Sequence, residues 1–166
     1  IYNFVALRRE LAARGATFNG HSDTEVLLAS FEAWGIPATL SRLNGMFAMA
    51  AWDNQEETLT LARDRFGKKP LYHARCGATW LIGSELKALR AHPAFDQGIS
   101  RPALAAFLRF GYIPGPHAIF EGVQKVPSGH FVVLGRKDDH ARFTPYWEAA
   151  DLLAKGAAHP FTGTEA

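Results

Sequence analysis

The sequence predicts an α+β sandwich whose sheet is largely antiparallel, because helical and strand-like patterns follow one another in separate blocks. Three helical patterns come first, at 4–14, 22–34 and 38–43. Four short strand-like segments then follow in succession, and a helical pattern comes after them. Helices and strands that are segregated along the chain are typical of helices packed on antiparallel sheets.

The first helices carry local start and stop signals. Residues 4–14 place apolar side chains at helical spacing with charged residues between them. Ser22 and Glu25 form an S-x-x-E capping box that opens the second helix. Gly35 and Pro37 are expected to end that helix, because glycine favours C-caps and proline cannot continue a helix.

The strand-like segments differ in character. Residues 46–52, MFAMAAW, are almost continuously apolar, so we expect a strand that is buried on both faces. The next three segments lie at 59–62, 71–74 and 79–83. Between 59–62 and 71–74 lies a charged turn that Pro70 closes by fixing φ.

Serine caps also mark two later helices. Ser84 is expected to cap a helix at 85–89, and Ser100 with an early proline is expected to start another at 101–110. Residues 123–134 are interpreted as two short strands around a Pro-Ser-Gly turn.

Length and composition restrict the class of protein. A chain of 166 residues that is 48% hydrophobic is expected to form one domain with a tail. The net charge of +2 comes from scattered charges, so neither nucleic acid nor a membrane is an expected partner. One cysteine and no long apolar segment fit a soluble, cytoplasmic protein. The chain begins at Ile1 rather than methionine, which indicates a fragment.

Five stretches, in order, resemble one known family. ARDRFGKKPLYHA followed by GSELKAL is similar to the core signature of the glutaminase domain of glutamine-hydrolysing asparagine synthetases. That domain is a class II glutamine amidotransferase. IYNFVALRREL, HSDTEV and LNGMFAMAAWD resemble further parts of the same domain. GYIPGPHAIFEGVQKVPSGHFVVL and TPYW resemble the segment that leads into the synthetase domain.

The resemblance implies a fold and a division of the chain. The fold would be the four-layer αββα sandwich of N-terminal-nucleophile hydrolases, incomplete at its N-terminal edge. Residues 1–92 would form part of the glutaminase domain, and 93–154 would complete it and enter the synthetase domain. Residues 155–166 are expected to be a linker or a frayed end.

The resemblance also implies an activity. The whole enzyme would be a carbon–nitrogen ligase of asparagine biosynthesis that takes ammonia from L-glutamine and amidates an adenylated aspartate. ATP and magnesium would bind in the absent synthetase domain, which is the expected partner of this chain within the same polypeptide. A homodimer is left open. The chain alone is expected to be inactive.

Asp23 is the one candidate site residue. From the residues alone, an acid in the first turn of a helix is explained by the helix dipole. The resemblance instead implies that this aspartate accepts the α-ammonium of bound glutamine through a charge-assisted hydrogen bond. The same resemblance places the nucleophilic cysteine before Ile1, so no catalytic residue is assigned within the chain.

Other candidates are weaker. Cys76 lies in a hairpin connection with no histidine nearby in sequence, so a catalytic role is not expected. The seven histidines lack metal-ligand spacing, and no metal site is predicted. The Gly67-Lys68 pair lacks the preceding glycine and the following Ser or Thr of a P-loop. Charges at 63–69 fit either a solvated turn or a loop that faces the synthetase domain.

Two alternatives to the asparagine synthetase function remain. The first is the glutaminase domain of another class II amidotransferase, which the GYIPGP and TPYW segments disfavour. The second is a non-catalytic interaction module that keeps the sandwich without the nucleophile. The residues encoded upstream of Ile1 would distinguish an enzyme, with Met-Cys-Gly at its start, from such a module.

Overall fold

The computed structural model describes residues 1–135, 141–159 and 163. Its helices are α1 (Phe4–Ala13), α2 (Asp23–Trp34), α3 (Ile36–Arg42), α4 (Leu86–Arg90), α5 (Arg101–Phe110) and α6 (Ala149–Ala158). Its strands are β1 (Ala48–Asp53), β2 (Thr58–Arg63), β3 (Tyr72–Cys76), β4 (Thr79–Gly83), β5 (Val123–Lys125), β6 (His130–Gly135) and β7 (Thr144–Pro145). Within the described ranges, no helix is long and apolar enough to cross a membrane.

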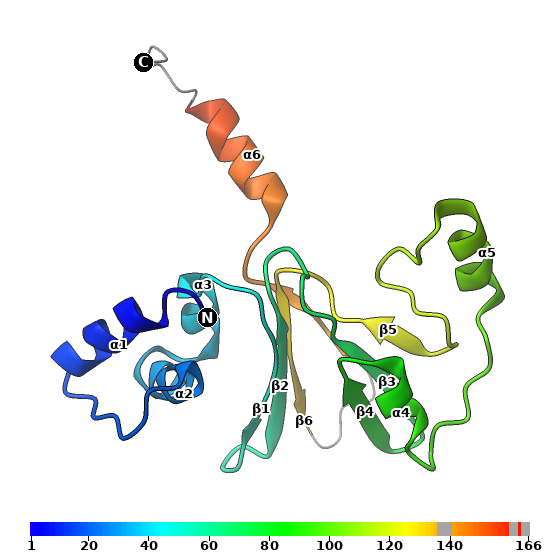
Figure 1. Ribbon diagram of the computed structural model, residues 1–166, viewed down its shortest axis with the longest axis horizontal. Helices are drawn as coiled ribbons and strands as arrows, with labels where there is room; N and C mark the ends of the chain where they lie inside the picture. Colours follow the sequence, from blue (N-terminus) through cyan, green and yellow to red (C-terminus); the bar gives the residue numbers. More distant parts are fainter. Residues whose placement is uncertain (136–140, 160–162, 164–166) are drawn as a thin grey trace.

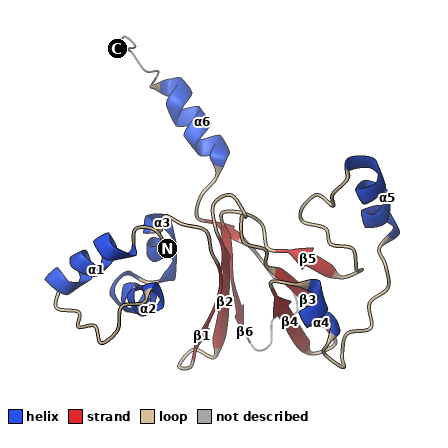
Figure 2. Cartoon of the chain, in the orientation of Figure 1, coloured by secondary structure: helices blue, strands red, loops and turns tan. Residues whose placement is uncertain are grey.

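The strands form two antiparallel sheets that face each other. One sheet has the order β1-β2-β6-β7 and the other β4-β3-β5. Helices α1 to α3 lie on the outer side of the first sheet, and α4 lies on the outer side of the second (Figures 1 and 2). The resulting order of layers, helix, sheet, sheet, helix, is the predicted αββα sandwich.

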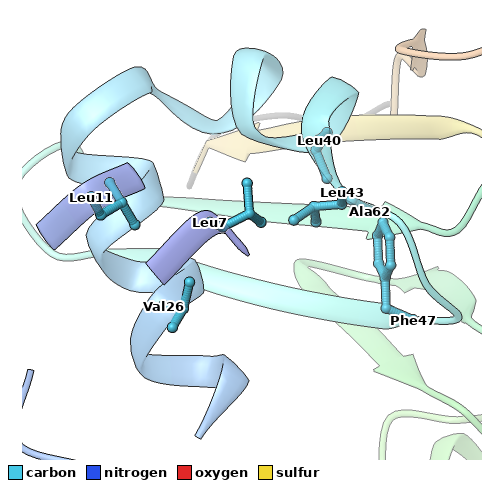
Figure 3. Packing of buried hydrophobic residues seen from close by; sticks show 7 residues of the cluster. All are labelled: Leu7, Leu11, Val26, Leu40, Leu43, Phe47 and Ala62. Carbon is cyan, nitrogen blue, oxygen red and sulfur yellow. The ribbon is translucent and has the colours of Figure 1, made fainter. Parts of the chain in front are cut away.

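Alternating side chains along each strand divide the core into three layers. In β2, Leu61 faces the second sheet and packs with Leu71 and Val132, whereas Ala62 faces the helices. The helix-side cluster contains Leu7, Leu11, Val26, Leu40, Leu43, Phe47 and Ala62 (Figure 3). A third cluster, including Ala74, Leu81 and Leu89, joins the second sheet to α4. Each interface between layers therefore has its own apolar core.

The central strand is not the one that its apolar run predicts. The 46–52 segment supplies β1, which is the edge of its sheet and only partly buried, with Trp52 58% exposed. Strand β2 has a neighbour on each side and is buried on both faces at Leu61 and Ala62. The expectation for 46–52 was wrong because sheet order depends on long-range pairing with β6, which local hydrophobicity does not encode.

Serine caps were predicted correctly at two helices. Ser22 accepts a hydrogen bond from the Glu25 N–H (3.3 Å), and Ser100 accepts one from the Ala103 N–H (3.3 Å). At α4 the cap is Glu85 rather than Ser84, one residue later than expected. Pro37 lies in the first turn of α3 instead of ending α2, because proline fits helix N-termini.

The C-terminal elements extend away from the sandwich. Helix α5 buries only Ala103 and exposes Leu104, Phe107, Leu108 and Phe110. Helix α6 projects from the body in Figure 1 and has no buried residue. Part of the tail predicted at 155–166 is thus helical as far as Ala158, and six of its later residues lie outside the described part of the chain. The domain boundaries remain a prediction.

Candidate functional site: a helix-terminal carboxylate

Asp23 is the first residue of α2, and its carboxylate contacts the main-chain nitrogen of Ile1. Its Oδ2 atom accepts a hydrogen bond from the α-amino nitrogen of Ile1 at 2.7 Å. The hydrogen bond from the Ile1 nitrogen is the main cause that lowers the pKa of Asp23; burial opposes it, and the N–H groups of Thr24 and Asp23 lower the pKa further. The side chain is 42% exposed, so the carboxylate remains ionised and accessible.

The Ile1 nitrogen is held in place by the connection between α3 and β1. The Tyr2 N–H donates to the Asn44 carbonyl oxygen at 2.8 Å. The Asn3 side chain accepts from the Asn44 N–H and donates to the Arg42 carbonyl oxygen, each at 2.9 Å. Sequence reasoning missed Asn3 and Asn44, because their partners lie about forty positions away.

Close packing at Gly45 completes this anchor. A Cβ at Gly45 would lie 3.1 Å from the Ile1 Cα, so a larger residue would push the first residues away from Asp23. The Asn44-Gly45 pair was interpreted only as a turn. In the structure it is the support against which the Ile1 main chain lies.

The other polar groups at the start of α2 have structural partners. Ser22 caps the helix. The Glu25 side chain does not close a capping box; it accepts from the N–H groups of Asn19 (2.6 Å) and Gly20 (3.0 Å). Glu25 also lies 3.9 Å from the Arg8 guanidinium. The Glu25 side chain is therefore held by the loop before α2, whereas the Asp23 carboxylate points to the Ile1 nitrogen.

An apolar groove lies next to this site. It has a volume of about 710 Å³ and lies between α2 and the free edge of β1, with Thr24, Leu28 and Trp52 among its lining residues. Asp23 itself does not line the groove, but the following residue Thr24 does. The structure thus places the carboxylate of Asp23 at the border of this apolar groove rather than inside it.

The charged turn at 63–69 is organised by its own first two residues. The Asp64 carboxylate is 1% exposed and accepts three main-chain N–H groups, from Phe66 (3.1 Å), Lys68 (2.9 Å) and Lys69 (2.9 Å). The Arg63 guanidinium donates to three main-chain carbonyl groups, those of Lys69, Gly67 and Val126. Both charges are held by main-chain groups of the folded turn. The interpretation of 63–69 as a solvated turn is therefore wrong for Arg63 and Asp64.

The remaining sequence candidates have structural surroundings. Cys76 is buried in the outer core of the second sheet, with Gln97 Nε2 3.8 Å from its sulfur. His73 is buried between the sheets, near Trp80 and Phe143. Across the described residues, no group of three His, Cys, Asp or Glu side chains could hold a metal ion.

Comparison with solved structures identifies the fold. Glutamine phosphoribosylpyrophosphate amidotransferase from B. subtilis, solved with ADP and GMP, superposes with a TM-score of 0.60 and 22% identity over 87% of this chain and 27% of that one. The fold is accordingly that of the N-terminal-nucleophile hydrolases.

Sequence comparison then gives the family. The glutamine amidotransferase domain matches residues 1–147, and the chain belongs to this family. It is 38% identical to asparagine synthetase [glutamine-hydrolyzing] 3 of Bacillus subtilis over 89% of this chain and 24% of that protein. It is also 31% identical to amidase chry2 of Gibberella zeae, over 93% and 22% of the two chains. The chain spans about a quarter of the length of these relatives.

Proposed function

We propose that the chain is the glutaminase part of an asparagine synthetase-like enzyme, which releases ammonia from glutamine for the amidation of an adenylated carboxylate. Asp23 would bind the α-ammonium of glutamine. The observations that support this role are the position of Asp23 in the first turn of α2, its 42% exposed side chain and its place at the border of the apolar groove that Thr24 lines.

The chemical step would use a group outside these residues. A cysteine thiolate would form a bond to the amide carbon of glutamine, and the C–N bond would break as its nitrogen takes up the proton lost by the thiol and leaves as ammonia. Water would then hydrolyse the thioester to glutamate and restore the thiol. Cys76 is buried on the outer side of the second sheet, so it is a poor substitute. The 166-residue chain alone is therefore proposed to be inactive.

The acceptor side of the reaction is proposed for the rest of the polypeptide. ATP and magnesium would bind there, and no residue of this chain is proposed to hold them. Aspartate is the acceptor we favour, because the Bacillus subtilis relative is named as an asparagine synthetase. The similarity to a protein named as an amidase favours, as the second candidate, a related enzyme that amidates a different carboxylate.

Steady-state glutaminase assays of the full-length protein test the role of Asp23. In Asp23→Asn the ammonium loses its ionic partner, and we expect KM for glutamine to rise about 10- to 100-fold, equivalent to the 1.5–3 kcal/mol typical of hydrogen bonds to charged groups. The control is Glu32→Gln, which removes an exposed carboxylate from the same helix. An unchanged KM in Asp23→Asn would refute the assignment, and so would an equal change in both variants.

A further inference from the structure

A second cavity lies at the other end of the sandwich, between the 63–69 turn and the bend that follows α5. Its volume is about 530 Å³, and Arg63, Phe66, Tyr112, Ile113 and Lys125 are among its lining residues. Among the described residues that line it there are two cations and no acidic side chain. The cavity is therefore positively charged.

Both cations are held by neutral groups. All three nitrogens of the Arg63 guanidinium donate to main-chain carbonyl oxygens, at 2.6 to 2.9 Å. The Lys125 ammonium donates to the carbonyl oxygen of Ile113. Neither residue takes part in any ion pair between described residues. These carbonyl groups position the charges without neutralising them.

The nearest acid in sequence does not compensate for these charges. Asp64 directs both carboxylate oxygens to the N–H groups of its own turn. Burial and, to a smaller extent, the charge of Arg63 lower the pKa of Lys125. An anion in the cavity would relieve this repulsion and would pair with two donors that are already fixed in position.

The rim of the cavity is typical of a protein interface rather than of a site for a small free anion. Phe66 and Tyr112 are 72% and 62% exposed. Apolar side chains of α5 continue the same exposed surface, including Phe110, whose ring lies 6.3 Å from that of Tyr112. Exposed aromatic side chains around a charged centre are characteristic of surfaces that another protein segment covers.

We propose that this cavity receives an aspartate or glutamate side chain from a part of the same polypeptide outside residues 1–166. The chain spans about a quarter of the length of its relatives, so a segment of sufficient size is expected. The inference rests on the proposed function, because it requires the synthetase domain that this function implies. It adds the chemistry of the contact: one carboxylate between Lys125 and Arg63, surrounded by apolar contacts to Phe66 and Tyr112.

Zero-length carbodiimide cross-linking of the full-length protein tests this contact, because the reagent joins an amine to a carboxylate only when the two groups touch. We expect mass spectrometry to find Lys125 linked to an aspartate or glutamate beyond the 166 residues. Lys87 and Glu85, whose charged atoms lie 2.6 Å apart on the surface, give an internal positive control. Lys125→Met should abolish the first link and leave the second unchanged.

If the control link between Lys87 and Glu85 forms, three results would overturn the proposal. They are a Lys125 link to an acid within residues 1–166, a link to a second copy in isotope-mixed samples, or no Lys125 link. Binding of a free anion would give the last result. The readout does not depend on glutamine hydrolysis, so a protein that forms the expected link without glutaminase activity would refute only the proposed function.

Discussion

The Tyr146 hydroxyl donates a 2.7 Å hydrogen bond to the main-chain oxygen of Arg63, 83 residues earlier in the sequence. Burial raises the pKa of Tyr146, and the nearby Asp64 charge raises it further, so the phenol stays protonated as a donor. The bond joins the TPYW segment to the charged turn. These two motifs, which the sequence places far apart, form one structural unit at the end of the sandwich.

Asp64 should be essential to that unit. In Asp64→Asn one amide oxygen is retained, but the amide NH₂ replaces the oxygen that accepts from Lys69 N–H. Because a buried donor then faces a donor, we expect the free energy of unfolding to fall by about 2–3 kcal/mol. Urea denaturation monitored by tryptophan fluorescence measures the change.

Asp53→Asn is the matched control. The Asp53 carboxylate also accepts two main-chain N–H groups, from Gln55 (2.8 Å) and Glu56 (3.0 Å), but both bonds go to the same oxygen. An asparagine can supply that oxygen, so we expect the free energy of unfolding to stay close to that of the wild type. Equal losses in the two variants would contradict the explanation for Asp64.

A methyl group at Gly129 should be far more damaging than one at Gly77. Both glycines have positive φ, 69° and 59°, so alanine is strained at each by about 1–2 kcal/mol. A Cβ at Gly129 would lie 2.2 Å from the Trp147 carbonyl oxygen, whereas nothing lies within 4 Å at Gly77. We expect Gly129→Ala to lower the free energy of unfolding by about 1–3 kcal/mol more than Gly77→Ala. Similar values in the two variants would show that Trp147 does not pack against Gly129.

The discrimination between glutamine and its deaminated analogue gives a second test of Asp23. Glutaramate lacks the α-amino group and would leave the carboxylate without its partner, so full-length wild-type protein should use it about 10- to 100-fold less efficiently, by kcat/KM, than glutamine. Asp23→Asn should reduce that ratio to nearly one. A variant that still discriminates strongly would show that another group binds the amine.

His73 should make folding sensitive to mild acid. Burial lowers its pKa from 6.5 to about 4, because the charged imidazolium is poorly solvated between the sheets. As pH falls from 6.5 to about 4, the unfolded chain binds a proton that the folded chain rejects, so stability decreases by up to about 3 kcal/mol. Above pH 6.5 the residue is neutral in both states and has no such effect.

Urea denaturation as a function of pH, compared between variants, isolates this effect from titrating carboxylates. His73→Phe should remove the decrease in stability between pH 6.5 and about 4. His159→Gln, at the exposed end of α6, should keep it. A wild-type-like pH profile in His73→Phe would show that His73 is not the source.

Local signals in the sequence were sufficient for most elements. Ser22 and Ser100 each accept from a main-chain N–H three residues on, so their role could be recognised within one turn. Motif resemblance supplied the αββα layers. The position of β1 at the sheet edge was not predictable, because β2 pairs with β6 from the far end of the chain.

The site was predictable only in part. The position of Asp23 at a helix start followed from its neighbours, but its contact with Ile1 depends on Asn3 and Asn44 meeting across the fold. Arg63 and Asp64 looked like surface charges, since charged residues are usually exposed. The burial of Asp64 and the partial burial of Arg63 depend on main-chain groups that become partners only after the turn has folded.

The free edge of β1 has a practical consequence for work with the 166-residue chain. Among the described strands β1 pairs only with β2, so its outer side presents a row of open main-chain donors and acceptors beside the exposed Trp52. Such an edge is a template for strand addition between molecules. Preparations of the isolated chain should therefore self-associate as their concentration rises. A segment that hydrogen-bonds along β1 would cover this edge and prevent the association.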